Sequence, residues 1–156
     1  MEIAVNNKSQ PQLIHVSAEQ GELVAPLFDA YRQFYGQLPD LEGARRFLSE
    51  RLGRGESVIF AAVEDGPALG FTQLYPSFSS VSMTSIWILN DLFVAEDARR
   101  QGVGARLLRA ARDHALRTGA ARLVLATAVT NTTAQALYEQ EGWRRDTVFL
   151  HYEYEL

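Results

Sequence analysis

Two arginines and two glycines lie close together in the middle of the chain, in the segment Arg99-Arg100-Gln101-Gly102-Val103-Gly104. They follow an apolar run and open a segment in which apolar residues recur at helical spacing. The first turn of a helix presents unpaired N–H groups and the positive end of the helix dipole, and glycines without a Cβ let a phosphate approach that backbone. The segment therefore predicts an anion site, and the expected ligand is a pyrophosphate.

Two widespread phosphate-binding motifs do not match this segment. A dinucleotide-binding G-x-G-x-x-G needs a third glycine where the chain has Leu107, and a P-loop needs Gly-Lys-Ser/Thr where Gly104 is followed by Ala105 and Arg106. On the glycines alone, an ordinary helix start with a glycine turn is an equally good interpretation, because short glycine motifs often match by chance. The surrounding elements have to decide.

The neighbouring segments form one strand–helix–strand unit. An apolar run at 86–94 predicts a strand buried on both faces, and the apolar spacing over 102–118 predicts a helix. After Gly119 a second buried strand is expected at 122–129. Such a unit should be parallel and right-handed.

The rest of the chain adds helices and strands on both sides of this unit. Helices are expected from the capping-box pattern of Ser17 and Gln20 to Phe34, from Asp40 to Leu52, and from Ala134 to Glu141. Further strands are expected at 13–16, 57–63, 69–75, 143–146 and 147–154, with a loop at 76–80. This order predicts an α/β (mixed α+β) fold with one mixed, mostly antiparallel sheet of about seven strands and about four helices.

Length and composition exclude several classes of protein. With 156 residues, 47% of them hydrophobic, we expect a single domain over residues 1–156 with a flexible segment at 1–10. The net charge of −4 argues against a nucleic-acid binder. Because there is no cysteine and the three histidines lack metal-ligand spacing, we expect no metal. No signal-like or membrane-length apolar run is found, so we expect a cytoplasmic protein without a membrane partner.

Two motifs carry a resemblance to a known family. The pattern Arg99-x-x-Gly102-x-Gly104 resembles the acetyl-CoA signature Q/R-x-x-G-x-G/A of the GNAT superfamily of N-acetyltransferases. The later pattern Asn131-x-x-Ala134-x-x-x-Tyr138-x-x-x-Gly142-Trp143 resembles that family's second signature, N-x-x-A-x-x-x-Y-x-x-x-G-F/W. The motifs occur in the family's order, and the resemblance covers residues 12 to 155. The segment 89–94 further resembles L-E-D-F/L-F/Y-V of diamine (spermidine/spermine) acetyltransferases, with Asn90 where those enzymes carry a glutamate.

The resemblance implies a GNAT fold and an acetyl-CoA-dependent N-acetyltransferase. The expected acceptor is the primary amine of a small molecule, such as a polyamine, an amino acid or an aminoalkyl compound. A protein lysine or N-terminal amine is one alternative acceptor, and a non-catalytic acetyl-CoA-binding sensor is a second alternative. Many family members are homodimers, so a homodimer is expected here too.

The resemblance also assigns the residues that hold acetyl-CoA. The set consists of main-chain groups next to the pyrophosphate and the pantetheine, together with two side chains, one just before the fourth expected helix and one within it. These residues are Leu92, Phe93, Val94, Arg99, Arg100, Gln101, Gly102, Val103, Gly104, Ala105, Asn131 and Tyr138.

The resemblance makes Tyr138 the expected general acid. It follows Asn131 by seven residues, about two helical turns, so both side chains share a helix face. In the family this hydroxyl lies near the cofactor sulfur. The alternatives are a core tyrosine that packs beside Leu137 and Trp143, and an Asn131 that only caps the helix.

Asp91 and Asn90 are the candidates for handling the amine. Asp91 is the only acid inside the central apolar run; buried near an amine, it could bind the ammonium group or relay its proton, whereas Asn90 can orient water. In a regular strand the two side chains face opposite sides, so only one would reach the site unless a bulge intervenes. Accepting hydrogen bonds from neighbouring loops is the alternative role for Asp91.

Aromatic residues outside the two motifs are expected near the acceptor. In the family, the helix region that carries Glu22, Asp29, Tyr31, Phe34 and Tyr35 here shapes the acceptor site, and an ordinary amphipathic helix is an equally good interpretation of these residues. Tyr75, Phe78 and Trp87 are expected either to line the cleft or to pack in the core.

Overall fold

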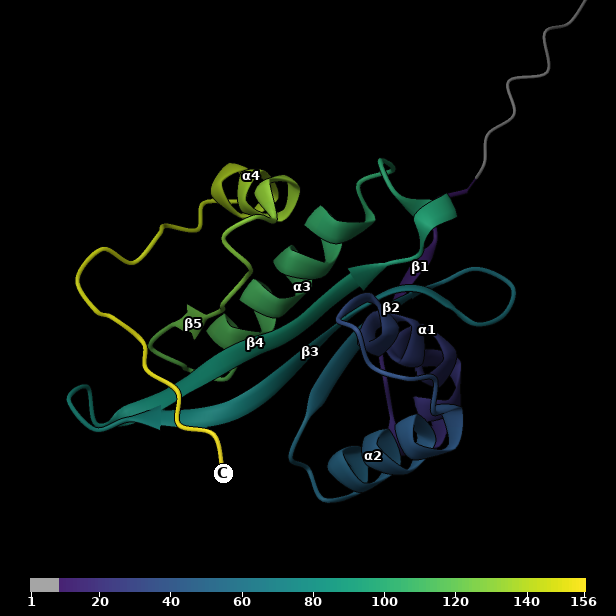
Figure 1. Cartoon of the computed structure of the whole chain (residues 1–156), viewed down its shortest axis with the longest axis horizontal. Helices are drawn as coiled ribbons and strands as arrows, with labels where there is room; N and C mark the ends of the chain where they lie inside the picture. The colour runs from purple at the N-terminus through teal and green to yellow at the C-terminus, as the bar shows by residue number, and fades with distance from the viewer. Residues whose placement is uncertain (1–8) are drawn as a thin grey trace, which may run out of the picture. The chain divides into compact units, whose positions relative to one another are not determined.

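The computed structural model describes residues 9–156 and divides into two compact units, one that ends at Leu125 and one that spans Ala126–Leu156 (Figure 1). The expected flexible segment at 1–10 lies mostly outside the described residues. The first unit holds β1 (Gln12–His15), α1 (Gly21–Phe34), α2 (Leu41–Gly53), β2 (Val58–Val63), β3 (Ala68–Ser79), β4 (Thr84–Val94), α3 (Val103–Arg117) and β5 (Leu123–Val124). Short 3₁₀ turns precede α1 (Ala18–Gln20) and α3 (Glu96–Ala98), and the second unit holds α4 (Thr132–Gln140).

The sheet of the first unit has five strands in the order β1-β2-β3-β4-β5. The first four strands are antiparallel neighbours, and β5 runs parallel to β4 after the α3 crossover. The expectations of four helices and of a mixed, mostly antiparallel sheet are confirmed. The expectation of about seven strands is wrong.

The two faces of the sheet are covered by different helices. A Cβ on Gly70 would meet side chains of α3, whereas the next residue, Phe71, packs its ring against Phe28 and Tyr31 of α1. Successive strand residues point to opposite faces. The helix α3 therefore covers one face, and α1 with its partner α2 covers the other.

The third strand is longer than the sequence suggested. The expected loop at 76–80 is wrong, because β3 continues to Ser79 and pairs with the start of β4. Pro76 fits inside this strand because pairing with β2 stops at Leu74, which leaves one edge of β3 open where a missing N–H does no harm.

The strands expected near the C-terminus do not form in the described residues. The parallel strand expected at 122–129 is limited to Leu123–Val124, and residues 143–156 contain no strand. A strand needs a backbone partner as well as suitable residues. In this segment the N–H groups of Val148 and Phe149 bond instead to Oδ1 of Asp146, at 2.9 and 3.2 Å, which bends the chain locally.

The second unit is built around α4. Oδ1 of Asn131 accepts a hydrogen bond from the N–H of Ala134 at 3.2 Å, so the expected N-cap is confirmed. The helix ends at Gln140; Gly142, two residues later, has a φ of 91°, and the N–H of Trp143 bonds back to the carbonyl of Tyr138.

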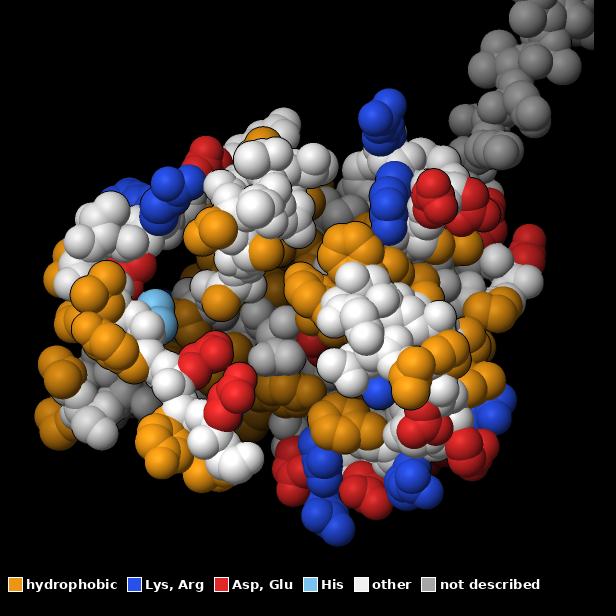
Figure 2. Space-filling model, in the orientation of Figure 1, with side chains coloured by type: hydrophobic (Ala, Val, Ile, Leu, Met, Phe, Trp, Pro, Cys, Tyr) orange, Lys and Arg blue, Asp and Glu red, His pale blue; other side chains and the backbone are white. Residues whose placement is uncertain are grey.

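A continuous apolar core supports the α1–α2 face of the sheet. Val24, Leu48, Ile59 and Phe71 are fully buried in it. Each such side chain contributes roughly 1.5–3 kcal/mol on burial. Charged side chains gather instead on the outer surface of α2, near the lower edge of Figure 2. No helix of the described residues is long and apolar enough to cross a membrane.

Candidate active site

A β-bulge in β4 brings the two candidate amine-handling residues to one site. Gln73 of β3 pairs with Asp91, but the next residue, Leu74, pairs with Leu89, so Asn90 is an extra residue without a partner in the ladder. The bulge reverses the alternation of faces. Trp87, before it, contacts His114 of α3, and Phe93, after it, packs against Tyr31 of α1. Asp91 therefore faces the α1–α2 side, and Asn90 lines the same pocket.

This pocket, of about 430 Å³, lies between α1, α2 and the bulge. Its lining consists of aromatic rings, polar groups and two small residues of α2. These residues are Phe28, Tyr31, Arg32, Tyr35, Gln37, Asp40, Gly43, Ala44, Phe47, Tyr75, Asn90 and Asp91. Of the aromatic residues expected at the site, Tyr31, Tyr35 and Tyr75 line the pocket. Trp87 lies on the α3 face, and Phe34 and Phe78 are exposed and do not line the pocket.

Asp91 is a buried carboxyl group with hydrogen bonds on both oxygens. Its Oδ2 accepts from Nε2 of Gln73 at 2.5 Å, and its Oδ1 accepts from Nδ2 of Asn90 at 3.0 Å. Burial raises the pKa of Asp91, and hydrogen bonds from the side chains of Gln73, Tyr31 and Asn90 oppose that rise. A carboxyl group with a raised pKa is better suited to accept a proton from an amine than an exposed one is.

Tyr75 shares the pocket with this carboxyl group. Burial, followed by the negative charge of Asp91, raises the pKa of the Tyr75 hydroxyl. Tyr75 therefore stays protonated at neutral pH and can act only as a neutral hydrogen-bonding group.

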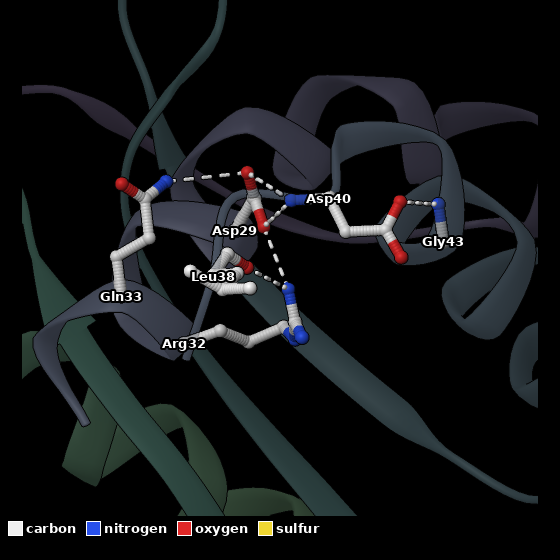
Figure 3. A network of polar contacts seen from close by, with 6 residues as sticks. All are labelled: Asp29, Arg32, Gln33, Leu38, Asp40 and Gly43. Atoms are coloured by element: carbon white, nitrogen blue, oxygen red, sulfur yellow. Dashed lines mark hydrogen bonds and ion pairs between the residues drawn. The ribbon is translucent and has the colours of Figure 1, made fainter. Parts of the chain in front are cut away.

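A buried carboxylate holds two residues that line the pocket, Arg32 and Asp40 (Figure 3). Asp29 of α1 accepts hydrogen bonds from Nη1 of Arg32 at 2.9 Å, from Nε2 of Gln33 at 3.2 Å, and from the backbone N–H of Asp40 at 3.1 Å. Nη1 of Arg32 also donates to the carbonyl of Leu38. The Asp40 carboxylate in turn caps α2 through the N–H of Gly43. Asp29 therefore ties the connection between α1 and α2 to α1.

The glycine segment opens α3 as expected. Gly102 is the N-cap of α3 with a φ of 78°, and Arg100 also has a positive φ, 61°. Two left-handed residues beside a helix start turn successive N–H groups toward one side, an arrangement that suits an anion. Val103, Gly104 and Ala105 form the first turn of the helix, whose N–H groups have no partner within it.

Close packing fixes this helix start against the sheet. A Cβ at Gly70 of β3 would lie 2.8 Å from Cγ1 of Val103 and 3.2 Å from Cδ1 of Leu107. Only glycine fits there without movement, so α3 begins next to the end of β4. The expected pantetheine residues Leu92, Phe93 and Val94 form that end.

The side chain of Arg99 is held by contacts with the end of β4. Its Nε donates to the carbonyl of Val94 at 3.0 Å, and its guanidinium lies over the ring of Phe93, 5.5 Å from the centroid. Arg99 thus links the end of β4 to the glycine segment. In this arrangement an anion would bind to the main-chain N–H groups of the segment and not to the side chain of Arg99.

Tyr138 lies on α4 and Asn131 caps that helix, both in the second unit. The ring of Tyr138 packs against Trp143, with 6.2 Å between centroids. The amide oxygen of Asn131 is used for capping. The approach of either side chain to acetyl-CoA stays a prediction.

Two of the three histidines meet in space, although they are far apart in the sequence. The rings of His15 and His114 are 5.8 Å apart, beside Phe60 and Trp87. Among the described residues no group of three or more possible ligands could hold a metal ion. The pair is part of the packing under α3.

Two polar residues at the site escaped the sequence analysis. Gln73 is fully buried and Ser57 nearly so, and the hydroxyl of Ser57 donates to Oε1 of Gln73 at 2.7 Å. The signal was a glutamine in the middle of an otherwise apolar strand, because buried polar side chains need partners.

Comparisons with known proteins agree with this geometry. A model of the acetyltransferase (GNAT) family matches residues 24–143. The chain is 57% identical over 129 residues to a Bacillus subtilis (strain 168) protein described as the uncharacterized N-acetyltransferase YhfO, which covers 83% of this chain and 87% of that protein. It is 32% identical over 99 residues to an aminoglycoside N(6')-acetyltransferase type 1 of Klebsiella aerogenes, covering 62% of this chain and 65% of that protein.

A solved structure extends the match to the whole fold. The crystal structure of a probable acetyltransferase superimposes with a TM-score of 0.87 at 47% sequence identity, covering 93% of this chain and 97% of that one. None of these comparisons confirms a special closeness to diamine acetyltransferases. The fold, the glycine segment and the family match lead to one conclusion: this chain is an acetyltransferase that belongs to the GNAT family, which uses acetyl-CoA.

Proposed function

We propose that the protein transfers an acetyl group from acetyl-CoA to the primary amine of a small molecule, and that Asp91 receives this amine. The observation that carries the proposal is the buried carboxyl group of Asp91 in a pocket lined with aromatic rings. A carboxylate and the faces of aromatic rings both attract a cation, and an alkylammonium group is one.

The amine has to lose a proton before it can attack. A free alkylamine has a pKa of about 10.4 and is mostly protonated at neutral pH. In the proposal Asp91 first binds the ammonium group and then accepts its proton. The raised pKa of the Asp91 carboxyl reduces the difference between its pKa and that of the ammonium group, which favours the proton transfer. Asn90, beside it, would orient the amine or a water molecule.

The glycine segment and the end of β4 fit acetyl-CoA. The backbone N–H groups from Arg100 to Ala105 would hold the pyrophosphate, supported by the two positive φ angles and the start of α3. The main chain of Leu92, Phe93 and Val94 would pair with the pantetheine. When bound, acetyl-CoA supplies the thioester that the amine attacks, and a backbone N–H at this edge would stabilise the negative oxygen that forms.

Tyr138 is proposed as the general acid that protonates the departing thiolate, and Asn131 as a contact of the cofactor. The capped start of α4 and the packing of Tyr138 on Trp143 give both residues a fixed place within their unit.

A small acceptor is favoured over a protein for two reasons. The pocket of about 430 Å³ has a size typical of small-molecule sites. One relative is by name an aminoglycoside acetyltransferase, and aminoglycosides are small molecules with primary amines. A protein amine and a non-catalytic sensor remain the alternatives.

The test is release of free CoA from acetyl-CoA across a panel of spermidine, short diamines, aminoalkyl phosphonates, amino acids and a lysine-rich peptide. Turnover with one small amine, lost in Asp91→Asn and at least tenfold lower in Tyr138→Phe, would support the assigned roles. Binding of acetyl-CoA without turnover of any amine would favour the sensor, and turnover of the peptide alone would favour a protein acceptor.

We also propose a homodimer. The C-terminal segment exposes Val148, Leu150, Tyr152 and Tyr154, and hydrophobic side chains gather along it in Figure 2. Monomeric proteins rarely leave such a patch uncovered. Sedimentation at several concentrations tests the proposal, and a monomer at all of them would contradict it.

A further inference from the structure

We propose that Ser57 and Gln73 position the carboxyl group of Asp91 and keep it hydrogen-bonded both with and without a proton. This inference rests on the proposed function, in which Asp91 takes the proton of the acceptor ammonium group. It assigns a role to two residues outside both family motifs.

The three side chains form a buried chain of polar groups. Their relative exposures are 6% for Ser57, 0% for Gln73 and 2% for Asp91. They come from the entry to β2, from β3 and from β4, beside the apolar residues Phe71 and Leu74. Apolar residues would fill such a place at less cost, since each buried polar group loses its contact with water. A chain in which each side chain is hydrogen-bonded to the next is therefore more consistent with a role at the site than with packing alone.

In the structure all donors of this chain point toward Asp91. The Ser57 hydroxyl donates to Oε1 of Gln73 at 2.7 Å, and Nε2 of Gln73 donates to Oδ2 of Asp91 at 2.5 Å. An ionised carboxylate can only accept hydrogen bonds, so this direction suits the charged form of Asp91.

The same atoms can also serve the protonated carboxyl. A protonated Asp91 has an O–H that must donate, and a half-turn of the Gln73 amide would present Oε1 to it. Nε2 of Gln73 would then face Ser57, whose hydroxyl can accept as well as donate. Both bonds are kept with the direction reversed, so a proton on Asp91 leaves no buried group without a partner.

Among residues 9–156, no other hydrogen-bonding neighbour of the Asp91 carboxyl group offers the same adjustment at a buried position. Asn90 donates to Oδ1, but it is exposed and can pair with water instead. The hydroxyl of Thr72 donates to the backbone carbonyl of Asp91 and leaves its carboxyl group untouched. Tyr31, from α1, is only partly buried.

The proton transfer itself is balanced. The N–H bond of the acceptor ammonium breaks and leaves its electron pair on nitrogen, while an O–H bond forms on Asp91. The proton returns to water through the open pocket after the product has left. The other titratable or charged groups that line the pocket are Tyr31, Tyr35, Tyr75, Arg32 and Asp40. The charge of Arg51 of α2 opposes the rise in the pKa of Tyr75.

The direct test is nuclear magnetic resonance of the whole protein with isotope-labelled glutamine, recorded as a function of pH. We expect the Gln73 side-chain amide signals to titrate together with the Asp91 carboxyl. We further expect the amide protons to show a cross-relaxation contact to Ser57 Hβ only below that midpoint. Amide protons that stay directed at Asp91 on both sides of the midpoint would overturn the inference.

Variants give a second test. In Ser57→Ala the reversed amide would leave a buried N–H without an acceptor, whereas the observed direction would leave only a carbonyl without a donor, which proteins tolerate better. The protonated form is therefore disfavoured, and we expect the acid midpoint of kcat/KM to fall by on the order of one pH unit. Ser57→Thr keeps the hydroxyl and should restore the wild-type midpoint.

Thr72→Val is the matched control. It removes a buried hydroxyl that donates to the backbone carbonyl of Asp91 and not to its carboxyl group. It should lower stability without moving the midpoint. A midpoint in Ser57→Ala equal to that of the wild type would contradict the inference. Because the magnetic resonance test needs no turnover, a reversal of Gln73 without amine acetylation would sink the proposed function alone.

Discussion

Asp29 should contribute far more to stability than an ordinary surface carboxylate does. Its side chain is 8% exposed and accepts hydrogen bonds from Arg32, Gln33 and the backbone of Asp40 (Figure 3). The change Asp29→Ala removes all of them at once. It leaves Arg32, itself 28% exposed, without its carboxylate partner, and it frees the connection that borders the pocket.

The magnitude follows from the number and kind of lost bonds. A hydrogen bond to a charged group is worth about 1.5–3 kcal/mol, and the bonds share one acceptor, so their contributions do not add fully. Water can reach part of the Arg32 guanidinium, which reduces the penalty for a charge left alone. We expect Asp29→Ala to lower the free energy of unfolding by about 2–4 kcal/mol. For a chain of this length that corresponds to a fall in Tm of roughly 4–16 °C.

The assay is chemical denaturation of Asp29→Ala beside Asp113→Ala. Asp113 pairs with Arg112 on the outside of α3, where the two side chains are 49% and 56% exposed, and exposed pairs contribute about 0–1 kcal/mol. The KM for the acceptor should also rise in Asp29→Ala, because Arg32 and Asp40, which line the pocket, lose their common partner, with little change in acetyl-CoA binding. A loss in Asp29→Ala no larger than that in Asp113→Ala would refute the argument.

Three further predictions concern single sites. Burial raises the pKa of Asp91 in the folded protein, so ionising Asp91 lowers stability as pH rises through the folded pKa, and this cost is absent below the unfolded pKa. Asp91→Asn should therefore abolish turnover yet match or exceed the wild-type Tm at neutral pH. A lower Tm there would contradict this prediction. Burial, with the charges of His15 and Arg117, lowers the pKa of His114, so the contribution of the neutral ring to stability is complete above about pH 6.5 and is lost as pH falls toward the folded pKa. Thermal unfolding at a series of pH values should show this fall in Tm. The variant His114→Phe should show a smaller dependence of Tm on pH. Gly70→Ala should lower the free energy of unfolding by about 1–3 kcal/mol, because its Cβ would displace Val103 at the start of α3. For the same reason it should weaken acetyl-CoA binding, measured by calorimetry. An unchanged affinity would show that Gly70 does not support the cofactor site.

The sequence predicted the parts of the fold that local patterns determine. The apolar run before the glycine segment, the helix from Val103 and the capped helix after Asn131 all formed as expected. In each case residues close in sequence supply the signal: apolar spacing, a glycine that accepts a positive φ, or an asparagine that caps.

The parts that failed depend on partners distant in sequence. Pro76 favours a loop, but it lies in β3 because β2 ends before it. The apolar residues after Asp146 favour a strand, but the described structure gives that segment no backbone partner. Local propensity cannot supply this information.

The candidate site divides in the same way. The glycine segment and Asp91 were found from residue types, whereas the joint presence of Asn90 and Asp91 in one pocket depends on the bulge. Gln73 pairs with Asp91 across β3 and β4, and no pattern within either strand indicates this contact.

The bulge also affects how the acceptor pocket can change in evolution. Leu89 and Asp91 each keep their own partner in β3, so residue 90 is in effect an insertion between two fixed positions. Its side chain lines the pocket, but its backbone is outside the ladder, so a new residue there changes the chemistry of the wall without disturbing the register. Comparing Asn90→Glu with the wild type, in thermal unfolding and across the amine panel, measures this independence. Position 90 is then a place where acceptor preference can diverge among related enzymes while their common scaffold stays the same.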